Sequence, residues 1–129
     1  HLIDHPLLST MPAEILSRAM VIKKAQRIDI ECVVRGYITG SAWAEYNKLG
    51  TVFDQKMPTG LQEGDKFPEL LFTPTTKAET GHDEPMSVSE VVDMVGTDLA
   101  RLLEQTSFRV YQFAHDYAFD KGIIIYKLL

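Results

Sequence analysis

The chain has 129 residues, of which 45% are hydrophobic, and a formal net charge of −5 at pH 7. This length and apolar content allow one domain with a buried core, which argues against a disordered chain. The basic residues are scattered and outnumbered by acidic ones, so we expect no nucleic-acid-binding surface. We see no apolar run of membrane-spanning length and no signal-peptide pattern, and the single Cys32 cannot form an internal disulfide. These features predict a reducing, cytoplasmic location without membrane partners.

After a turn and a short helix predicted at 11–15, the next predicted elements are two antiparallel strands. Apolar and β-branched residues are frequent at 19–23 and 28–37, and the polar stretch 24–27 separates the two runs. Within 28–37 apolar and other residues alternate, so one face of this strand is expected to be apolar and the other to carry Glu31 and Arg35. Taken alone, this charged pair would be expected on a solvated strand face.

The second strand leads into a glycine-bounded turn that resembles an anion-binding corner. Arg35, at the strand end, offers a planar fork of donors to a phosphate or a carboxylate. Gly40 lets the backbone approach a ligand closely. Ser41 is predicted to cap the short helix that follows it, whose N-terminal amides would face the same anion. Strand, turn and helix start are therefore expected to form one unit.

The middle of the chain contains short elements and two polar segments. Helical spacing of apolar residues supports the helix over 40–49, and Gly50 is expected to end it. A short strand within 51–56, a surface loop over 57–68 and a second short strand at 70–72 follow. The next segment, 73–85, lacks apolar periodicity and contains Lys77, His82, Asp83 and Glu84. On composition alone, this charged loop would be expected to be solvated.

Two helices are predicted over 88–95 and 98–121. Ser87 and Glu90 form a capping-box pattern ahead of the first. In the second, residues recurring at steps of three and four predict a core-facing side, while His115 and Asp116 are expected at the surface. A buried strand is expected at 123–126. The predicted core-facing residues are Leu99, Leu102, Leu103, Thr106, Val110, Phe113, Ala114 and Tyr117.

Two stretches carry a family resemblance. Residues 31–41 read Glu-Cys-Val-Val-Arg-Gly-Tyr-Ile-Thr-Gly-Ser, and residues 72–79 read Phe-Thr-Pro-Thr-Thr-Lys-Ala-Glu, followed by Gly-His-Asp-Glu at 81–84. In this order and spacing they resemble the phosphoribosylaminoimidazole-succinocarboxamide synthase (SAICAR synthetase) family of purine biosynthesis. The resemblance runs from about Met11 to Ile125. It reverses the expectation that the charged loop is only solvated.

The resemblance implies an α/β (α+β) domain of ATP-grasp-like type, with an antiparallel or mixed sheet packed with C-terminal helices. Residues 1–129 would form a single domain, the central substrate-binding part of the enzyme. The family's N-terminal nucleotide-covering region and its C-terminal metal-site strands have no counterpart in this sequence. The segment alone is therefore expected to be inactive.

The implied activity is an ATP-dependent ligase. It joins the carboxylate of carboxyaminoimidazole ribonucleotide (CAIR) to the amine of L-aspartate and yields SAICAR, ADP and phosphate through an acyl phosphate. ATP and Mg²⁺ are the implied cofactors. Since the metal-binding carboxylates are expected in the C-terminal strands, no residue here is assigned as a metal ligand.

The resemblance also implies roles for individual residues. Arg35, Gly40 and Ser41 would bind the ribonucleotide phosphate, and Lys77 would contact a substrate carboxylate or phosphoryl group. His82 and Asp83 would organise the ribonucleotide or aspartate site, so they join Lys77 as catalytic candidates. Two alternatives stay open: a non-catalytic phosphosugar- or nucleotide-binding domain, and a structural module with solvated charges. The sequence also leaves a homo-oligomer open.

Overall fold

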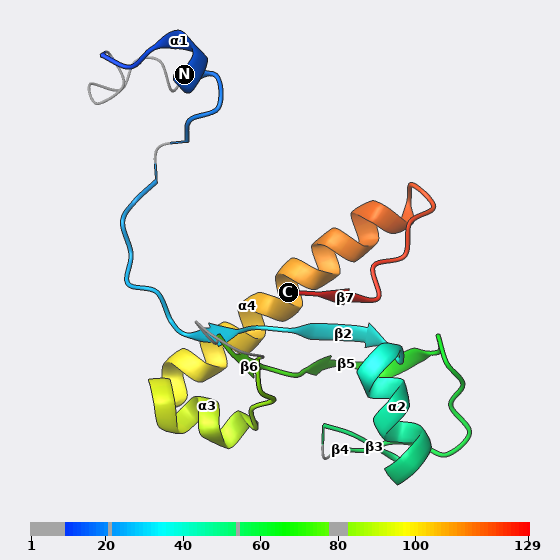
Figure 1. The fold of residues 1–129 in the computed structure, drawn as a ribbon. Coiled ribbons are helices and arrows are strands. Elements are labelled where there is room, and N and C mark those ends of the chain that lie inside the picture. Colours follow the sequence, from blue (N-terminus) through cyan, green and yellow to red (C-terminus); the bar gives the residue numbers. More distant parts are fainter. Residues whose placement is uncertain (1–9, 21, 54, 78–82) are drawn as a thin grey trace.

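The computed structural model describes residues 10–20, 22–53, 55–77 and 83–129 (Figure 1). In these residues short strands alternate with helices in the first part of the chain, and two helices dominate the last third. The elements are α1 (Ala13–Leu16), β1 (Ile30–Glu31), β2 (Val34–Tyr37), α2 (Gly40–Leu49), β3 (Thr51–Val52), β4 (Gln55–Lys56), β5 (Lys66–Phe72), β6 (Thr75–Thr76), α3 (Val88–Val95), α4 (Thr97–Phe119) and β7 (Lys127–Leu128).

The central sheet has three antiparallel strands in the order β5-β2-β7. Val34 on β2 pairs with Phe72 on one side and with Leu128 on the other. The β2–β5 ladder continues through a hydrogen bond from the Thr73 N–H to the Val33 carbonyl (2.8 Å) into the β1–β6 pair. Strand β2 is thus enclosed on both edges, and the expected antiparallel sheet is confirmed.

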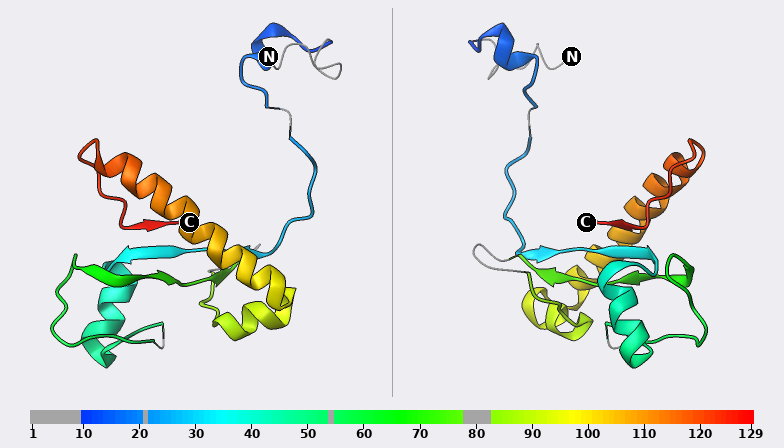
Figure 2. Two further views of the ribbon diagram at one scale, coloured as in Figure 1. Left: turned by 180° about the vertical axis from the view of Figure 1, so that it is seen from behind. Right: turned by 45° about the vertical axis from the view of Figure 1, so that its right-hand side comes forward.

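Helices pack at the two ends of this sheet (Figures 1 and 2). Helix α4 crosses the sheet and carries α3 at one end, while α2 and the β3–β4 hairpin lie at the other end of β2 and β5. The buried side chains form separate clusters rather than one core. One joins α2 and the hairpin to β5, another joins β1 to α3 and α4, and a third places Tyr111 of α4 against Val34 and Phe72. Each end of the sheet thus has its own buried cluster, and Tyr111 of α4 packs against the strands between them.

Several local predictions are confirmed. Helix α2 spans Gly40–Leu49, and Gly50 ends it in the left-handed conformation with φ 71°. The capping box of α3 is complete, since Ser87 Oγ accepts from the Glu90 N–H (3.2 Å) and Glu90 Oε2 accepts from the Ser87 N–H (2.7 Å). No helix among the described residues is long and apolar enough to cross a membrane.

The first predicted strand is wrong. The described residues of the 19–23 run form no strand, and Met20 and Ile22 are 76% and 72% exposed. The chain here runs away from the sheet (Figure 1), and no strand of the described part of the chain lies beside it. A β-prone sequence forms a strand only where such a partner lies within reach.

The predicted core side of α4 is only partly confirmed: Leu103 packs against the cluster that joins β1 to α3 and α4, and Leu99 and Ala114 are half-buried. Leu102, Val110, Phe113 and Tyr117 are between 52% and 76% exposed, whereas Ala100, Tyr111 and His115 are buried. His115, expected at the surface, lies between aromatic rings, and its Nε2 is 3.0 Å from the Tyr37 hydroxyl oxygen. The apolar periodicity predicted that large apolar residues face the sheet. The buried positions are instead taken by the small Ala100 and by Tyr111 and His115, whose side chains end in hydrogen-bonding groups.

The C-terminal strand and the polar segment also differ from expectation. Ile123 and Ile124 are more than half exposed, and the strand is β7 at Lys127–Leu128. The segment 73–85, expected to lack a packing role, contains β6 and the buried Thr73. Pairing of β6 with β1 and the hydrogen bond from the Thr73 N–H to the Val33 carbonyl place residues 73–77, where periodicity gives no signal.

Candidate functional site

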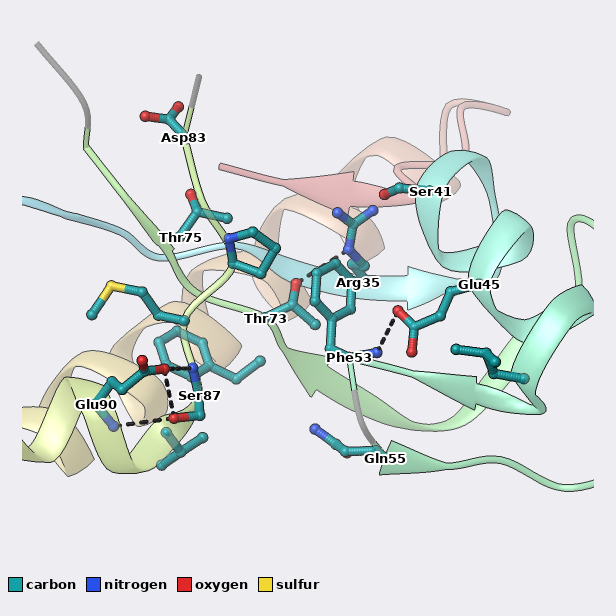
Figure 3. A pocket seen from close by; sticks show the side chains of 15 residues that line it. Arg35, Ser41, Glu45, Phe53, Gln55, Thr73, Thr75, Asp83, Ser87 and Glu90 are labelled. Carbon is teal, nitrogen blue, oxygen red and sulfur yellow. Dashed lines mark hydrogen bonds between the residues drawn. The ribbon is translucent and has the colours of Figure 1, made fainter. Parts of the chain in front are cut away.

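A cavity of about 770 Å³ opens between the two packed ends of the sheet (Figure 3). Its volume lies in the range of small-molecule sites. Strands β2 and β5 lead into it, α2 and the hairpin form one wall, and the start of α3 forms the opposite wall. Its lining comprises Arg35, Ser41, Glu45, Leu49, Phe53, Gln55, Phe72, Thr73, Thr75, Asp83, Pro85, Met86, Ser87, Val88 and Glu90.

Arg35 is the buried cation of this cavity. It is 7% exposed because β2 is the middle strand of its sheet. Its Nε donates to Thr73 Oγ1 (3.1 Å), and its Cζ lies 5.0 Å from the centroid of the Phe53 ring. Within the described part of the chain, Arg35 has no carboxylate partner and its terminal Nη atoms have no acceptor. The expectation of a solvated face around Arg35 is therefore wrong.

The electrostatics of Arg35 favour an anion. Burial lowers the pKa of its guanidinium, since the charged form loses hydration. A buried charge without a partner is unfavourable, and an anionic ligand with oxygen acceptors would supply both the charge and the missing hydrogen bonds. Figure 3 shows the terminal nitrogens on the side of the guanidinium that faces Ser41.

Gly40 and Ser41 lie at the start of α2, but not with the predicted cap. The N-cap residue is Thr39, and no side chain caps this helix. Gly40 has φ +57°, a left-handed value that glycine adopts without strain, and a Cβ there would meet nothing within 4 Å. Ser41 follows in the first turn, and its side chain lines the cavity with that of Arg35. The predicted cap is wrong because the N-cap is Thr39, so the chain enters the helix two residues earlier than a Ser41 cap requires.

Of the other predicted site residues that the structure describes, Asp83 lines the cavity and Lys77 does not. Asp83 is exposed and lines the cavity near Thr75 (Figure 3). Lys77 is not among the lining residues; it forms an ion pair with Glu31 beside the β1–β6 pair. Hydrogen bonding to Glu31 raises the pKa of Lys77. His82 lies outside the described residues. The structure therefore brings Arg35, Ser41 and Asp83 to one cavity and places Lys77 beside it.

Three of the lining residues that the sequence did not assign to a site contact Arg35 or one another. Glu45 accepts hydrogen bonds through Oε1 from Thr51 Oγ1 (2.8 Å) and through Oε2 from the Phe53 N–H (3.0 Å). Phe53 is the one described non-glycine residue with positive φ, at 49°. Thr73 follows a predicted strand directly, a signal that could have placed it near Arg35. Glu45 and Phe53 come together only because the β3–β4 hairpin forms, and no sequence pattern predicted this hairpin.

The magnesium ion implied by the family resemblance has no ligand set in this part of the molecule. Among the described residues, no three His, Cys, Asp or Glu side chains gather in a group that could hold a metal ion. Mg²⁺ is usually held by carboxylates together with substrate phosphates and water. We therefore assign no step of the chemistry to a metal bound by these residues.

Comparison with known proteins identifies the family. A family model described as SAICAR synthetase matches residues 1–128. The chain belongs to the SAICAR synthetase family. It is 50% identical over 120 residues to phosphoribosylaminoimidazole-succinocarboxamide synthase of Schizosaccharomyces pombe, and 51% identical over 108 residues to that of Elusimicrobium minutum. These matches cover 93% and 84% of this chain but only 40% and 37% of the two relatives.

A solved SAICAR synthase supports the same assignment. The structure described as SAICAR-synthase from Saccharomyces cerevisiae complexed with SAICAR superposes with a TM-score of 0.77 at 39% identity. The match covers 98% of this chain and 45% of the yeast chain. The chain therefore has the ATP-grasp-like α/β fold of that family over less than half of its relatives' length.

Proposed function

We propose that this chain is the substrate-binding part of an ATP-dependent ligase that joins CAIR and L-aspartate to give SAICAR, ADP and phosphate. The observation that carries the proposal is the buried Arg35, without an acidic partner among the described residues, at a cavity large enough for a ribonucleotide. Membership of the SAICAR synthetase family supports the reaction class. We also propose that the enzyme is cytoplasmic and that its partners are small molecules. The proposal leaves open whether it forms a homo-oligomer.

In this proposal Arg35 and Ser41 bind the ribonucleotide phosphate. The Arg35 Nη atoms donate charge-assisted hydrogen bonds to its oxygens, and the Ser41 hydroxyl donates one more. Gly40 keeps the helix start open, since no Cβ stands between the backbone and the ligand. The phosphate thereby fixes one end of the substrate and leaves its carboxylate for the reaction.

The chemistry requires activation of that carboxylate. Its oxygen attacks the γ-phosphorus of ATP, ADP leaves, and an acyl phosphate forms. The aspartate amine then attacks the acyl carbon, phosphate leaves, and the amine loses a proton. We propose ATP and Mg²⁺ as the cofactors. When bound, Mg²⁺ would neutralise charge at the phosphates.

Lys77, His82 and Asp83 complete the proposed site. Asp83 lines the cavity and could accept hydrogen bonds from ribonucleotide or aspartate donors. Lys77 would contact a substrate carboxylate or phosphoryl group only after leaving Glu31, so a bound anion must compete with that ion pair. His82 is proposed on the family resemblance alone.

The test is an ADP-release assay on the protein at the length of its fungal relatives, with ribonucleotide, L-aspartate and ATP plus Mg²⁺ varied in turn. We expect ADP release only when all are present. Arg35→Ala should raise the KM for the ribonucleotide about ten- to a hundredfold, equivalent to 1.5–3 kcal/mol for a hydrogen bond to a charged group. Ribonucleotide binding without ADP release would instead support a non-catalytic phosphosugar-binding domain.

A further inference from the structure

The β3–β4 hairpin places an aromatic ring beneath the Arg35 guanidinium. Phe53 lies in the turn of this hairpin, and its ring packs partly against the cluster around Ile38 and Val52. The Arg35 Cζ lies 5.0 Å from the ring centroid, within the range of a cation–π contact. The ring therefore forms a floor for the guanidinium on the side away from Ser41 (Figure 3).

Phe53 holds this position in an uncommon backbone conformation. Its φ of 49° lies in the left-handed region, which is unfavourable for a bulky residue unless the surroundings stabilise it. Glu45, on α2, supplies part of that stabilisation, because its carboxylate accepts hydrogen bonds from both the Phe53 N–H and the Thr51 hydroxyl. The same side chain thus ties α2 to Phe53 itself and to Thr51, two residues before it.

The orientation of Arg35 depends on two contacts in the described part of the chain. Thr73 Oγ1 accepts from Nε and fixes one edge of the guanidinium, while the Phe53 ring fixes the plane. Without the ring, the guanidinium could rotate about its bond to Thr73 and turn its Nη atoms away from the cavity. A long flexible side chain gains affinity for an anion when it is held in place before binding.

We propose that Phe53 and Glu45 are positioning residues for the phosphate-binding Arg35. Phe53 holds the guanidinium plane through its ring, and Glu45 holds Phe53 through its hydrogen bonds. This inference rests on the proposed role of Arg35 in binding the ribonucleotide phosphate. Both residues also line the cavity, and in this proposal they act on affinity through Arg35.

The experiment compares variants of the protein at the length of its fungal relatives. Phe53→Leu removes the ring but keeps an apolar side chain, and Phe53→Tyr keeps the ring. We expect Phe53→Leu to raise the KM for the ribonucleotide about two- to thirtyfold, with kcat and the KM for ATP unchanged. Phe53→Tyr should stay within about twofold of the parent protein.

A double-mutant cycle separates positioning from a general loss of structure. If Phe53 acts through Arg35, adding Phe53→Leu to Arg35→Ala causes no further rise in the ribonucleotide KM. Independent, multiplicative effects of the two substitutions would overturn the inference. If Arg35→Ala itself has no effect, the proposed phosphate site fails; if Arg35→Ala acts but Phe53→Leu does not, only the positioning role fails.

Glu45 is tested with a matched pair. Glu45→Gln keeps an acceptor for the Phe53 N–H, and its amide can donate to the Thr51 hydroxyl, so the ribonucleotide KM should change less than about twofold. Glu45→Ala leaves the Phe53 N–H without this acceptor and should reproduce the KM effect of Phe53→Leu. Equal losses for Gln and Ala would show that the charge matters rather than the hydrogen bonds, and would overturn the role assigned to Glu45.

Discussion

Gly36 should be one of the least replaceable residues of the sheet. It lies in β2 beside Arg35, and a Cβ at this position would stand 2.0 Å from the Tyr111 hydroxyl oxygen and 2.8 Å from its Cζ. Tyr111 is only 2% exposed, and its hydroxyl donates to the Ile125 carbonyl (2.6 Å). The ring therefore cannot move aside without breaking a hydrogen bond and disturbing the contact between α4 and the sheet.

The magnitude follows from these contacts. Forcing an added methyl group into a packed interior costs about 1–3 kcal/mol. Losing the Tyr111 hydrogen bond adds about 1 kcal/mol. Gly36→Ala should therefore lower the free energy of unfolding by about 2–4 kcal/mol, measured as a shift of the urea unfolding midpoint against the parent protein.

A second variant tests the geometric reasoning. Tyr111→Phe removes the atom nearest to the added methyl group, but Cζ would still lie 2.8 Å away, so relief should be partial. The destabilisation of the double variant Gly36→Ala/Tyr111→Phe should be smaller than the sum of the two single effects. Additive losses, or a Gly36→Ala protein as stable as the parent, would refute the proposed clash.

The remaining predictions concern binding, pH and the polar loop. Thr73→Val removes the acceptor for Arg35 Nε and should raise the ribonucleotide KM about two- to tenfold in the ADP-release assay. Burial raises the pKa of Tyr111 to about 12, above the ordinary value near 10. The stability that depends on the neutral phenol is therefore complete below pH 10 and is lost as the pH rises toward 12. Between pH 10 and 12 the urea unfolding midpoint of Tyr111→Phe should fall less with pH than that of the parent protein. Lys77→Met should lower kcat with little change in melting temperature, because its pairing with Glu31 is exposed; equal losses would indicate a structural lysine.

Local signals in the sequence predicted those elements whose ends are set by neighbouring residues. Gly50 ends α2 because the left-handed conformation is open to glycine, and Ser87 and Glu90 start α3 through hydrogen bonds between residues close in sequence. Arg35 and Ser41 were predicted to lie together for the same reason, since a strand, a glycine and a serine follow one another. That these residues share a cavity with Asp83 could not be predicted, because Asp83 is distant in sequence and reaches them only in the folded chain.

Features set by distant partners could not be predicted. Arg35 is buried because β5 and β7 flank β2, and alternation along one strand does not show how many neighbours that strand has. The packed side of α4 depends on the ring of Tyr37 and the gap left by Gly36, which accept His115 and Tyr111 in place of larger apolar groups. Glu45 likewise meets Phe53 only because the hairpin folds back on α2.

The strand order β5-β2-β7 also implies an order of folding. The contacts that hold Arg35 come from residues between Val34 and Thr73, whereas β7 reaches β2 only after the whole of α4. Closing the longer loop takes more chain entropy, so the arginine site should form before the second edge of β2 is covered. Pulsed hydrogen exchange during refolding should protect the Thr73 N–H, bonded to Val33, before the Gly36 N–H, bonded to Tyr126. Simultaneous protection would indicate that both edges of β2 assemble in one step.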